Sequence, residues 1–318
     1  MALSRLRDTK KEARREESIE PDPAPYPESP VEDAGPKVTA ILIVYNQAES
    51  LRRAIEALER SHDRERLEIL VVDCGSQDES PQLDVEYPSV TMMRLPHHFG
   101  ATKAMNIGTR TAKAETIFYL SPAVEVAPDT VTKLSAALEQ ESDAAAVCPL
   151  LVDSEGRPVV KVQRIPTPAS LAAVCRGDAP PVAEIDLTQE SVAVEYPGID
   201  ALMVRKQFVK GMNYFDGRYG QYWADADLAM QVRRAQKKIR LYPGIRVTYH
   251  PEPSAQPEDP LLAADRALGA AEFVGKYNGF MAGLGFRISA SLRALGRLDM
   301  RQFSALVSGQ KLDGSQAG

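Results

Sequence analysis

Cysteine is scarce in this chain and has no spacing that would signal a bound metal or a disulfide framework. The three cysteines, Cys74, Cys148 and Cys175, lie far apart and form no CxxC or CxxH pair. Small secreted domains are typically rich in paired cysteines, whereas cytosolic proteins keep theirs reduced. The sequence therefore excludes a zinc module and a disulfide-stapled domain, and it favours a reducing compartment.

Long apolar runs and an excess of positive charge are also missing. No run approaches the roughly 20 apolar residues that a membrane-spanning helix needs, and the first residues lack the apolar core of a signal peptide. A net charge of −6 and a pI near 5.5 argue against a general nucleic-acid binder. We therefore expect a cytoplasmic protein that binds no nucleic acid.

Residues 68–80 are the most informative segment that is present. The apolar run from Glu68 to Asp73 has the β-branched composition of a strand buried on both faces of a parallel sheet. It is followed by Gly75, Ser76 and Asp78, and ligands of open α/β sheets bind at the carboxyl ends of strands. The alternative is an ordinary Asx-type turn, because Asp, Gly and Ser are common turn residues.

Apolar runs alternate with helical spacings through the middle of the chain. Strands are expected at 38–45, 68–73, 90–95, 116–120, 145–152, 239–242 and 247–250. Helices are expected over a segment that includes Leu51, Ile55 and Leu58, and at 100–111, 128–139 and 224–237. Strands that alternate with helices predict an α/β fold with a doubly wound, mostly parallel sheet.

Composition divides the chain into three parts. Residues 1–36 are charged and proline-rich, which predicts a short charged helix and an extended tail. Residues 37–252 contain the predicted sheet. Within them, 153–196 is expected to be a proline-rich loop with a short helix, and loops this long are often lids or acceptor-binding segments. Residues 253–318 form a C-terminal extension, helical from 261 to about 301.

Several segments together resemble a family 2 glycosyltransferase of the GT-A fold, the Rossmann-like fold of nucleotide-diphospho-sugar transferases, and in particular the rhamnosyltransferase-like bacterial members. The resemblance runs from about residue 38 to His250. It is carried by Val44-Tyr45-Asn46, Asp73-Cys74-Gly75-Ser76-Gln77-Asp78, Phe99-Gly100 with Asn106-Ile107-Gly108, Phe215-Asp216, Asp225-Ala226-Asp227-Leu228 and His250.

The resemblance implies inverting transfer of a hexose from a nucleotide-sugar donor to an acceptor hydroxyl, in the synthesis of a cell-envelope polysaccharide. It implies that Asp225 is the catalytic base. The residues expected to hold the nucleotide are Tyr45, Asp73, Ser76 and Asp78, and those on the diphosphate or acceptor side are Lys103, His98, His250, Asp227 and Trp223.

Two positions depart from the family pattern. The family implies a divalent ion, Mg²⁺ or Mn²⁺, held by an aspartate at position 123, but Ala123 cannot ligate a metal. Ala224 likewise replaces the glutamate that precedes the base, and Glu125 lies two residues beyond the missing ligand. No confident metal ligand is therefore predicted.

These departures leave two interpretations open. In one, side-chain cations do the work of the metal, with Arg94, His97, His98, Lys103 and His250 as candidates. In the other, catalysis is lost and the protein is a nucleotide-sugar-binding pseudoenzyme or a scaffold for an active partner. A partner that binds no nucleotide is a third, weaker hypothesis.

Some candidates also have a purely structural interpretation. Asp225 is suited to the first turn of a helix, and Trp223 is equally suited to a core. The C-terminal helix carries arginines between apolar residues, which is typical of a membrane-surface segment serving a lipid-linked acceptor. Packing against the sheet domain explains the same pattern. The localisation expected is cytoplasmic, with peripheral contact at the inner face of the membrane as the alternative.

Overall fold

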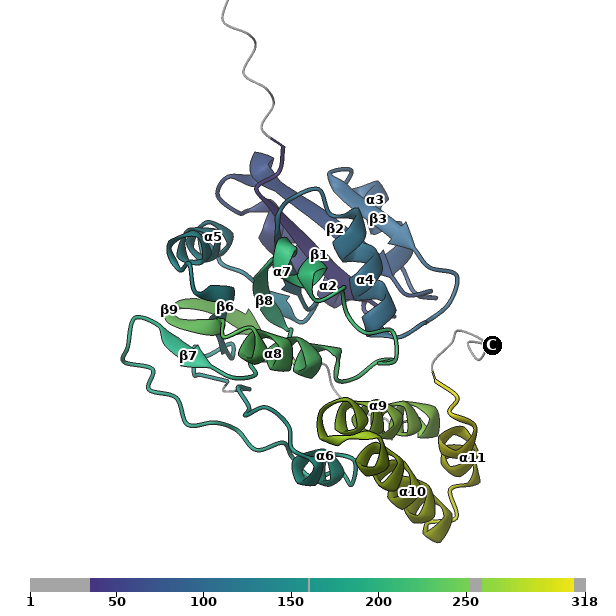
Figure 1. Cartoon of the computed structure of the whole chain (residues 1–318). Helices are drawn as coiled ribbons and strands as arrows, with labels where there is room; N and C mark the ends of the chain where they lie inside the picture. Colours follow the sequence, from purple (N-terminus) through teal and green to yellow (C-terminus); the bar gives the residue numbers. More distant parts are fainter. Residues whose placement is uncertain (1–34, 160, 252–258, 312–318) are drawn as a thin grey trace, which may run out of the picture. The chain divides into compact units, whose positions relative to one another are not determined.

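The computed structural model describes residues 35–159, 161–251 and 259–311 (Figure 1). From Gly35 onward the chain forms one compact unit. The helix and tail expected over residues 1–34 lie outside the described residues.

A nine-stranded mixed sheet forms the centre of the fold (Figure 1). Its strands are β1 (Val38–Val44), β2 (Leu67–Asp73), β3 (Val90–Arg94), β4 (Thr116–Leu120), β5 (Val124–Glu125), β6 (Ala144–Val152), β7 (Val192–Val194), β8 (Ala201–Arg205) and β9 (Lys238–Tyr249). Their order is β3-β2-β1-β4-β8-β6-β9-β5, with β7 beside β9. The pairs β1–β2, β1–β4, β2–β3 and β6–β9 are parallel. The predicted α/β fold with a mostly parallel sheet is confirmed.

Strand β8 was not predicted, and it changes the middle of the sheet. It lies between β4 and β6 and is antiparallel to both. Its five residues follow a long proline-rich segment and are too short to show a clear period. Strand β9 corrects a second expectation, because the two strands predicted at 239–242 and 247–250 are one strand with a register shift opposite Pro149 and Leu150.

Helices cover both faces of the sheet (Figure 1). They are α2 (Ala48–Glu59), α3 (Leu83–Glu86), α4 (Ala101–Thr111), α5 (Thr130–Gln140), α6 (Pro168–Val174), α7 (Lys206–Gly211) and α8 (Ala224–Arg234), with 3₁₀ turns η1 (Arg64–Arg66) and η2 (Ser80–Gln82). The side chains of α2 and α5 pack on one face, and those of α4 and α8 on the other. The predicted residues Leu51, Ile55 and Leu58 are all fully buried on the inner side of α2.

Over the described residues 259–311, the C-terminal extension forms three helices rather than the single helix expected from 261 to 301. These are α9 (Pro260–Asn278), α10 (Phe280–Gly296) and α11 (Met300–Ser308). Gly279, at φ 100°, ends α9 and begins α10, and Leu298, at φ 59°, lies in the turn before α11. Positive φ values are incompatible with a continuous right-handed helix, so the chain reverses at both points. None of the helices in the described ranges has the length and apolarity to cross a membrane.

Candidate functional site

The turns that follow β1 and β2 are tied together by hydrogen bonds. Asp73 is 1% exposed, and one of its carboxylate oxygens accepts the backbone N–H groups of Gly75 and Ser76, each at 3.2 Å. Gly75 has φ +79°, and a Cβ there would lie 3.0 Å from the Cα of His97. The segment that follows β3 therefore closes over this turn, and Asp73 organises the turn from within.

Ser76 and Asp78 also bind backbone groups. The Ser76 hydroxyl accepts the N–H of Asn46 at 2.9 Å, and Asp78 accepts the N–H of Ala48 at 2.9 Å, at the start of α2. Asn46, at φ 53°, accepts the N–H of Gln77 at 2.8 Å through its side chain. These contacts fix the loops at the strand ends, so the nucleotide-holding roles of Asp73, Ser76 and Asp78 stay a prediction.

Tyr45 presents an aromatic surface at this edge. Its side chain is 38% exposed, and its ring centroid lies 4.5 Å from that of His98. His98 Nδ1 accepts the N–H of Gly100 at 3.1 Å, and burial lowers the pKa of the imidazole. His98 is therefore neutral at pH 7 and pairs with Tyr45 as a ring rather than as a cation.

Two other predicted cations are engaged locally. Lys103 Nζ lies 3.7 Å from the ring centroid of Phe99. Arg94 donates to both carboxylate oxygens of Asp84, at 2.6 and 2.7 Å, and to the carbonyl of Pro81. The first of these contacts is a cation–π pair and the second an exposed ion pair.

A cavity of about 240 Å³ opens at the carboxyl ends of β1 and β4, beside the first turns of α4. Its lining includes Ile43, Met105, Ser121, Asp200 and Gln221. The carbonyl of Asp200 accepts the N–H of Ser121 at 2.7 Å, which places Asp200 beside the end of β4. Sequence reasoning missed Asp200, because its position depends on β8; recognition of the apolar run at 201–204 as a strand would have found it.

Asp225 lies in the first turn of α8, close enough to Asp200, which lines this cavity, for the two carboxylates to interact. It is half-buried, and its carboxylate accepts the Tyr196 hydroxyl at 2.8 Å and the N–H of Ala226 at 2.9 Å. Burial raises the pKa of Asp225 above its ordinary value, and the nearby Asp200 carboxylate adds to the rise. A carboxylate with a raised pKa at a strand-end cavity is suited to accept a proton near neutral pH.

Trp223 is an anchor between α8 and α9. Its side chain is largely buried, and its indole N–H donates to the carbonyl of Arg266 at 2.9 Å. Its backbone has φ 77°, a strained value for a bulky residue, immediately before α8 begins. This geometry fits the core interpretation of Trp223; a role in stacking on a sugar stays a prediction.

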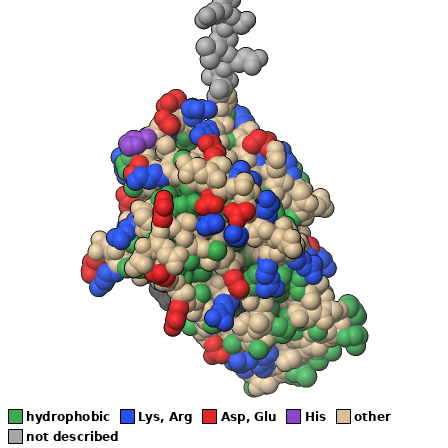
Figure 2. Space-filling view, turned by 60° about the vertical axis from the view of Figure 1, so that its left-hand side comes forward, with side chains coloured by type: hydrophobic (Ala, Val, Ile, Leu, Met, Phe, Trp, Pro, Cys, Tyr) green, Lys and Arg blue, Asp and Glu red, His purple; other side chains and the backbone are tan. Residues whose placement is uncertain are grey.

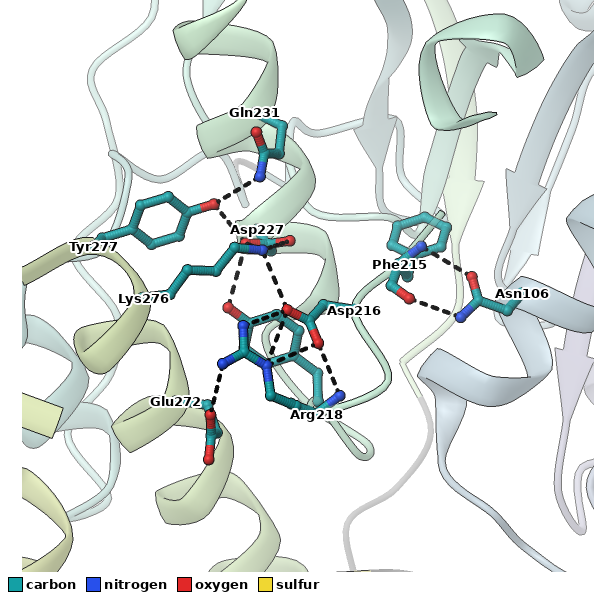
Figure 3. Close-up of polar contacts among 10 residues, drawn as sticks. Asn106, Phe215, Asp216, Arg218, Asp227, Gln231, Glu272, Lys276 and Tyr277 are labelled. Carbon is teal, nitrogen blue, oxygen red and sulfur yellow. Dashed lines mark hydrogen bonds and ion pairs between the residues drawn. The ribbon is translucent and has the colours of Figure 1, made fainter. Parts of the chain in front are cut away.

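Asp227 ties the start of α8 to α9 (Figure 3). It is 1% exposed and lies 2.8 Å from Lys276 Nζ, and it accepts the hydroxyls of Tyr277 at 2.5 Å and Tyr219 at 3.3 Å. Three donors occupy most of the roughly four acceptor sites of this buried carboxylate. These contacts hold Asp227 between α8 and α9, and its place on the diphosphate or acceptor side stays a prediction.

Asp216 extends the same network (Figure 3). Lys276 Nζ lies 3.4 Å from Asp216, and Arg218 donates to it at 2.7 Å and holds the pKa of this carboxyl well below its usual range. Next to it, the side chain of Asn106 donates to the carbonyl of Phe215 at 2.8 Å and accepts its N–H at 2.9 Å. Helices α4 and α9 thus fix the segment that leads to Asp225.

The residues around position 123 do not fit a divalent ion. The carbonyl of Ala123 accepts the N–H of His250 at 2.8 Å, and His250 Nε2 lies 3.0 Å from Glu125. Arg60 makes a second contact to Glu125 at 3.5 Å. Across 35–159, 161–251 and 259–311, no three His, Cys, Asp or Glu side chains form a metal-binding group. No step of the chemistry is therefore assigned to a metal.

The fold and its strand-end cavity define the class as a GT-A protein, and the comparisons agree. GalNAc-T7, whose crystal structure holds UDP, GalNAc and Mn²⁺, matches with a TM-score of 0.56 and 14% identity over 69% of this chain. That match spans 44% of GalNAc-T7. TarS 1–349 of S. aureus matches with a TM-score of 0.51 and 16% identity, over 85% of this chain and 81% of that one.

The family model described as Glycosyl transferase family 2 matches residues 39–192. This match to residues 39–192 agrees with the resemblance that the sequence motifs indicate. No curated protein matches the sequence. The match ends before Asp225 and before α9, so the role predicted for Asp225 and the place of the C-terminal helices are not covered by it.

Proposed function

We propose that the protein is an inverting glycosyltransferase, which moves a hexose from a nucleotide-sugar donor to an acceptor hydroxyl. The observation that carries this proposal is Asp225, a half-buried carboxylate of raised pKa. It lies beside Asp200, which lines the cavity at the strand ends. The nucleotide-sugar donor is further supported by the match of residues 39–192 to the family 2 model.

The proposed chemistry is a direct displacement at the anomeric carbon. Asp225 accepts the proton of the acceptor hydroxyl while the hydroxyl oxygen attacks the anomeric carbon. The bond from the anomeric carbon to the diphosphate breaks at the same time, and its electron pair stays on the diphosphate oxygen. Tyr196 donates to Asp225 and holds its carboxylate in orientation. The partly exposed ring of Tyr45 is positioned to contact the nucleotide base.

The acceptor is proposed to be a polysaccharide or a lipid-linked saccharide, in bacterial cell-envelope synthesis and of rhamnosyltransferase-like type. The acceptor segment 153–196 supplies Tyr196 directly to the base. A nucleotide-sugar-binding protein without turnover is the second candidate, and Ala123 is the observation in its favour. The hydrogen bond from Tyr196 to Asp225 and the raised pKa of Asp225 favour an active enzyme.

One pair of variants separates these candidates. Asp225→Asn is expected to lower kcat by about 100-fold or more, the usual contribution of a general base, with donor affinity unchanged. Asp178→Asn, on the exposed part of the acceptor segment, is the matched control. Donor affinity is measured by calorimetry with UDP-, dTDP- and GDP-sugars, and transfer by release of the nucleoside diphosphate.

Unchanged transfer in Asp225→Asn would remove this residue as the base. Donor binding without any transfer in the unsubstituted chain would leave the non-catalytic candidate. No binding of any nucleotide sugar would refute both.

We also propose that α10 binds the surface of an anionic membrane. The charged residues of α10, Arg287 and Arg293, are partly buried. Its row of large apolar side chains faces solvent: Met281, Leu284, Ile288, Leu292 and Leu295. Figure 2 shows hydrophobic side chains gathered at the lower end of the molecule, where the C-terminal helices lie. Monomeric proteins seldom expose so continuous an apolar row.

The charges beside this row favour a lipid surface as its partner. Arg293, Arg297 and Arg301 lie at its far end, whereas the nearby Asp299 caps α11 by accepting the N–H of Gln302. Arginines that flank an apolar helical face match anionic headgroups above an acyl layer. Such a contact suits a lipid-linked acceptor.

Vesicle co-sedimentation tests the membrane contact. The protein is expected to bind phosphatidylglycerol vesicles but not phosphatidylcholine vesicles, and Ile288→Glu with Leu292→Glu is expected to abolish binding. Val85→Glu, at an apolar residue of α3 that is 80% exposed, is the matched control. Binding that survives the double substitution, or a dimer in sedimentation velocity that the same substitution dissociates, would overturn the proposal.

A further inference from the structure

Lys161 is a cation at the candidate site that the sequence did not reveal. Its Nζ lies 2.7 Å from Oδ2 of Asp200 and 3.4 Å from the ring centroid of Tyr249, and its side chain is 32% exposed. Asp200 lines the strand-end cavity. The ammonium group is thus held at the edge of the site by an anion and an aromatic face.

The two residues that hold Lys161 also flank the position of the missing metal ligand. The carbonyl of Asp200 accepts the N–H of Ser121. Tyr249 pairs with Val124 in the sheet, and the next residue, His250, donates its N–H to Ala123. The turn between β4 and β5, which contains Ala123, therefore lies between the neighbours of Lys161.

The other predicted cations have contacts of their own. Burial keeps His98 neutral, and Arg94 binds Asp84. Lys103 stacks on Phe99, the ring of His97 lies 6.1 Å from that of Phe99, and His250 pairs with Glu125. For Lys161, burial alone would lower the pKa of the ammonium, but the Asp200 carboxylate outweighs it and the pKa is raised. Lys161 therefore keeps its charge at neutral pH.

We propose that Lys161 binds the diphosphate of the donor and takes the place of the metal ion that Ala123 cannot hold. This inference rests on the proposed function. As the bond between the anomeric carbon and the diphosphate oxygen breaks, the electron pair stays on that oxygen. The ammonium stabilises the charge through an N–H donor and gives up no proton; the acceptor proton goes to Asp225.

The ion pair with Asp200 does not disqualify Lys161. A metal ion held by aspartates is neutralised by them in the same way, and it binds phosphate through its open coordination positions. An ammonium has three N–H donors, of which Asp200 accepts one. Asp200 thus positions the ammonium group of Lys161 as a carboxylate ligand positions a bound metal ion.

Nucleotide affinity with and without the diphosphate group tests the proposal. UDP, dTDP and GDP, and the corresponding nucleosides, are titrated in EDTA and again with Mn²⁺. The unsubstituted chain is expected to bind its preferred diphosphate equally well in both. Lys161→Met is expected to weaken diphosphate binding about tenfold or more, the usual loss for a charged hydrogen bond, and to leave nucleoside binding unchanged.

Three further variants make the test specific. Lys161→Arg keeps the charge and is expected to retain most of the affinity. Lys210→Met, which removes a lysine paired with Glu115 at 3.4 Å on the surface, is the matched control and is expected to bind as the unsubstituted chain does. Ala123→Asp restores the missing carboxylate and is expected to make diphosphate binding stronger in Mn²⁺ than in EDTA.

The outcomes separate this inference from the function on which it rests. If no diphosphate binds the unsubstituted chain under either condition, the proposed function fails and Lys161 with it. If the chain binds diphosphate only with Mn²⁺, or if Lys161→Met binds as tightly as the unsubstituted chain, the role of Lys161 is wrong and the glycosyltransferase proposal stands. Loss of diphosphate and nucleoside binding together in Lys161→Met, with no rescue by arginine, would also refute it.

Discussion

At the scale of single residues, the site combines carboxylates in different environments. Asp73 and Asp78 accept backbone N–H groups of the loops that follow β1 and β2. Asp225 is shielded from water beside a second carboxylate, Asp200, so the pKa of Asp225 is raised. The residue types were visible in the sequence, but which carboxylate is poised for proton transfer follows from the neighbours that folding supplies.

The raised pKa of Asp225 gives a prediction about stability. The folded protein holds a proton on Asp225 at pH values where the unfolded chain has already lost it, so stability falls as the pH rises above 3.8, the ordinary value. Asp225→Asn removes that loss and is expected to raise the melting temperature at pH 7. The difference is expected to disappear as the pH falls to 3.8.

Thermal unfolding of both proteins across this pH range checks the prediction. Asp178→Asn, the exposed control, is expected to behave as the unsubstituted chain does at every pH. A variant that is less stable than the unsubstituted chain at pH 7 would show that ionised Asp225 is well accommodated, contrary to the direction inferred from its burial.

At the scale of elements, the contact between α8 and α9 determines where Asp225 lies. Helix α8 was predicted at 224–237 and is found at Ala224–Arg234, so its periodicity was sufficient. Helix α9, which packs against α8, was predicted only as part of a single helix from 261 to about 301, because the apolar spacing continues through Gly279. The positive φ of Gly279, which turns the chain back at the end of α9, cannot be read from a single glycine.

Substitution of Lys276 tests the contact between α8 and α9, because Lys276 joins α9 to Asp216 and Asp227 (Figure 3). Lys276→Met leaves the buried Asp227 without its cation and is expected to cost about 2 kcal/mol of unfolding free energy, less than for a fully buried pair because Lys276 is partly exposed. We expect kcat to fall as well, since α8 carries the proposed base.

Urea unfolding and transfer assays measure the two effects. Lys210→Met, an exposed lysine of similar kind, is expected to change the unfolding free energy by less than about 0.5 kcal/mol. If Lys276→Met is as stable as this control, Tyr277 and Tyr219 are sufficient for Asp227 and the ion pair contributes nothing measurable.

At the scale of the whole molecule, the C-terminal helices share a core with the sheet. Ala270, Phe273 and Val274 of α9 belong to the same hydrophobic cluster as Ile41 and Val72 of the sheet. The domain boundary predicted at 252 stays a prediction, but this shared core argues that α9 and the sheet unfold together. Cooperative unfolding is the usual behaviour of elements with a common core.

Phe273→Ala tests this cooperativity. Phe273 is 1% exposed, and its loss is expected to cost about 4 kcal/mol while calorimetry still shows one transition. Phe280→Ala, at a residue of α10 that is 76% exposed, is the control and is expected to be within about 0.5 kcal/mol of the unsubstituted chain. Two separate transitions would place a domain boundary near residue 252.

The sequence by itself determined most of the strands and helices of the first half, the α/β class and the segments at which ligand and base were expected. These follow from local periodicity and from turn residues, which act over a few positions along the chain. Only the tertiary structure decided that β8 enters the sheet antiparallel, that Asp200 and Lys161 meet beside Ala123, and that α9 fixes Asp227. Lys161 and Asp200 are 39 positions apart in the chain, and Asp227 and Lys276 are 49 apart. Local pattern cannot specify such pairs, because their energy comes from packing and charge between distant segments.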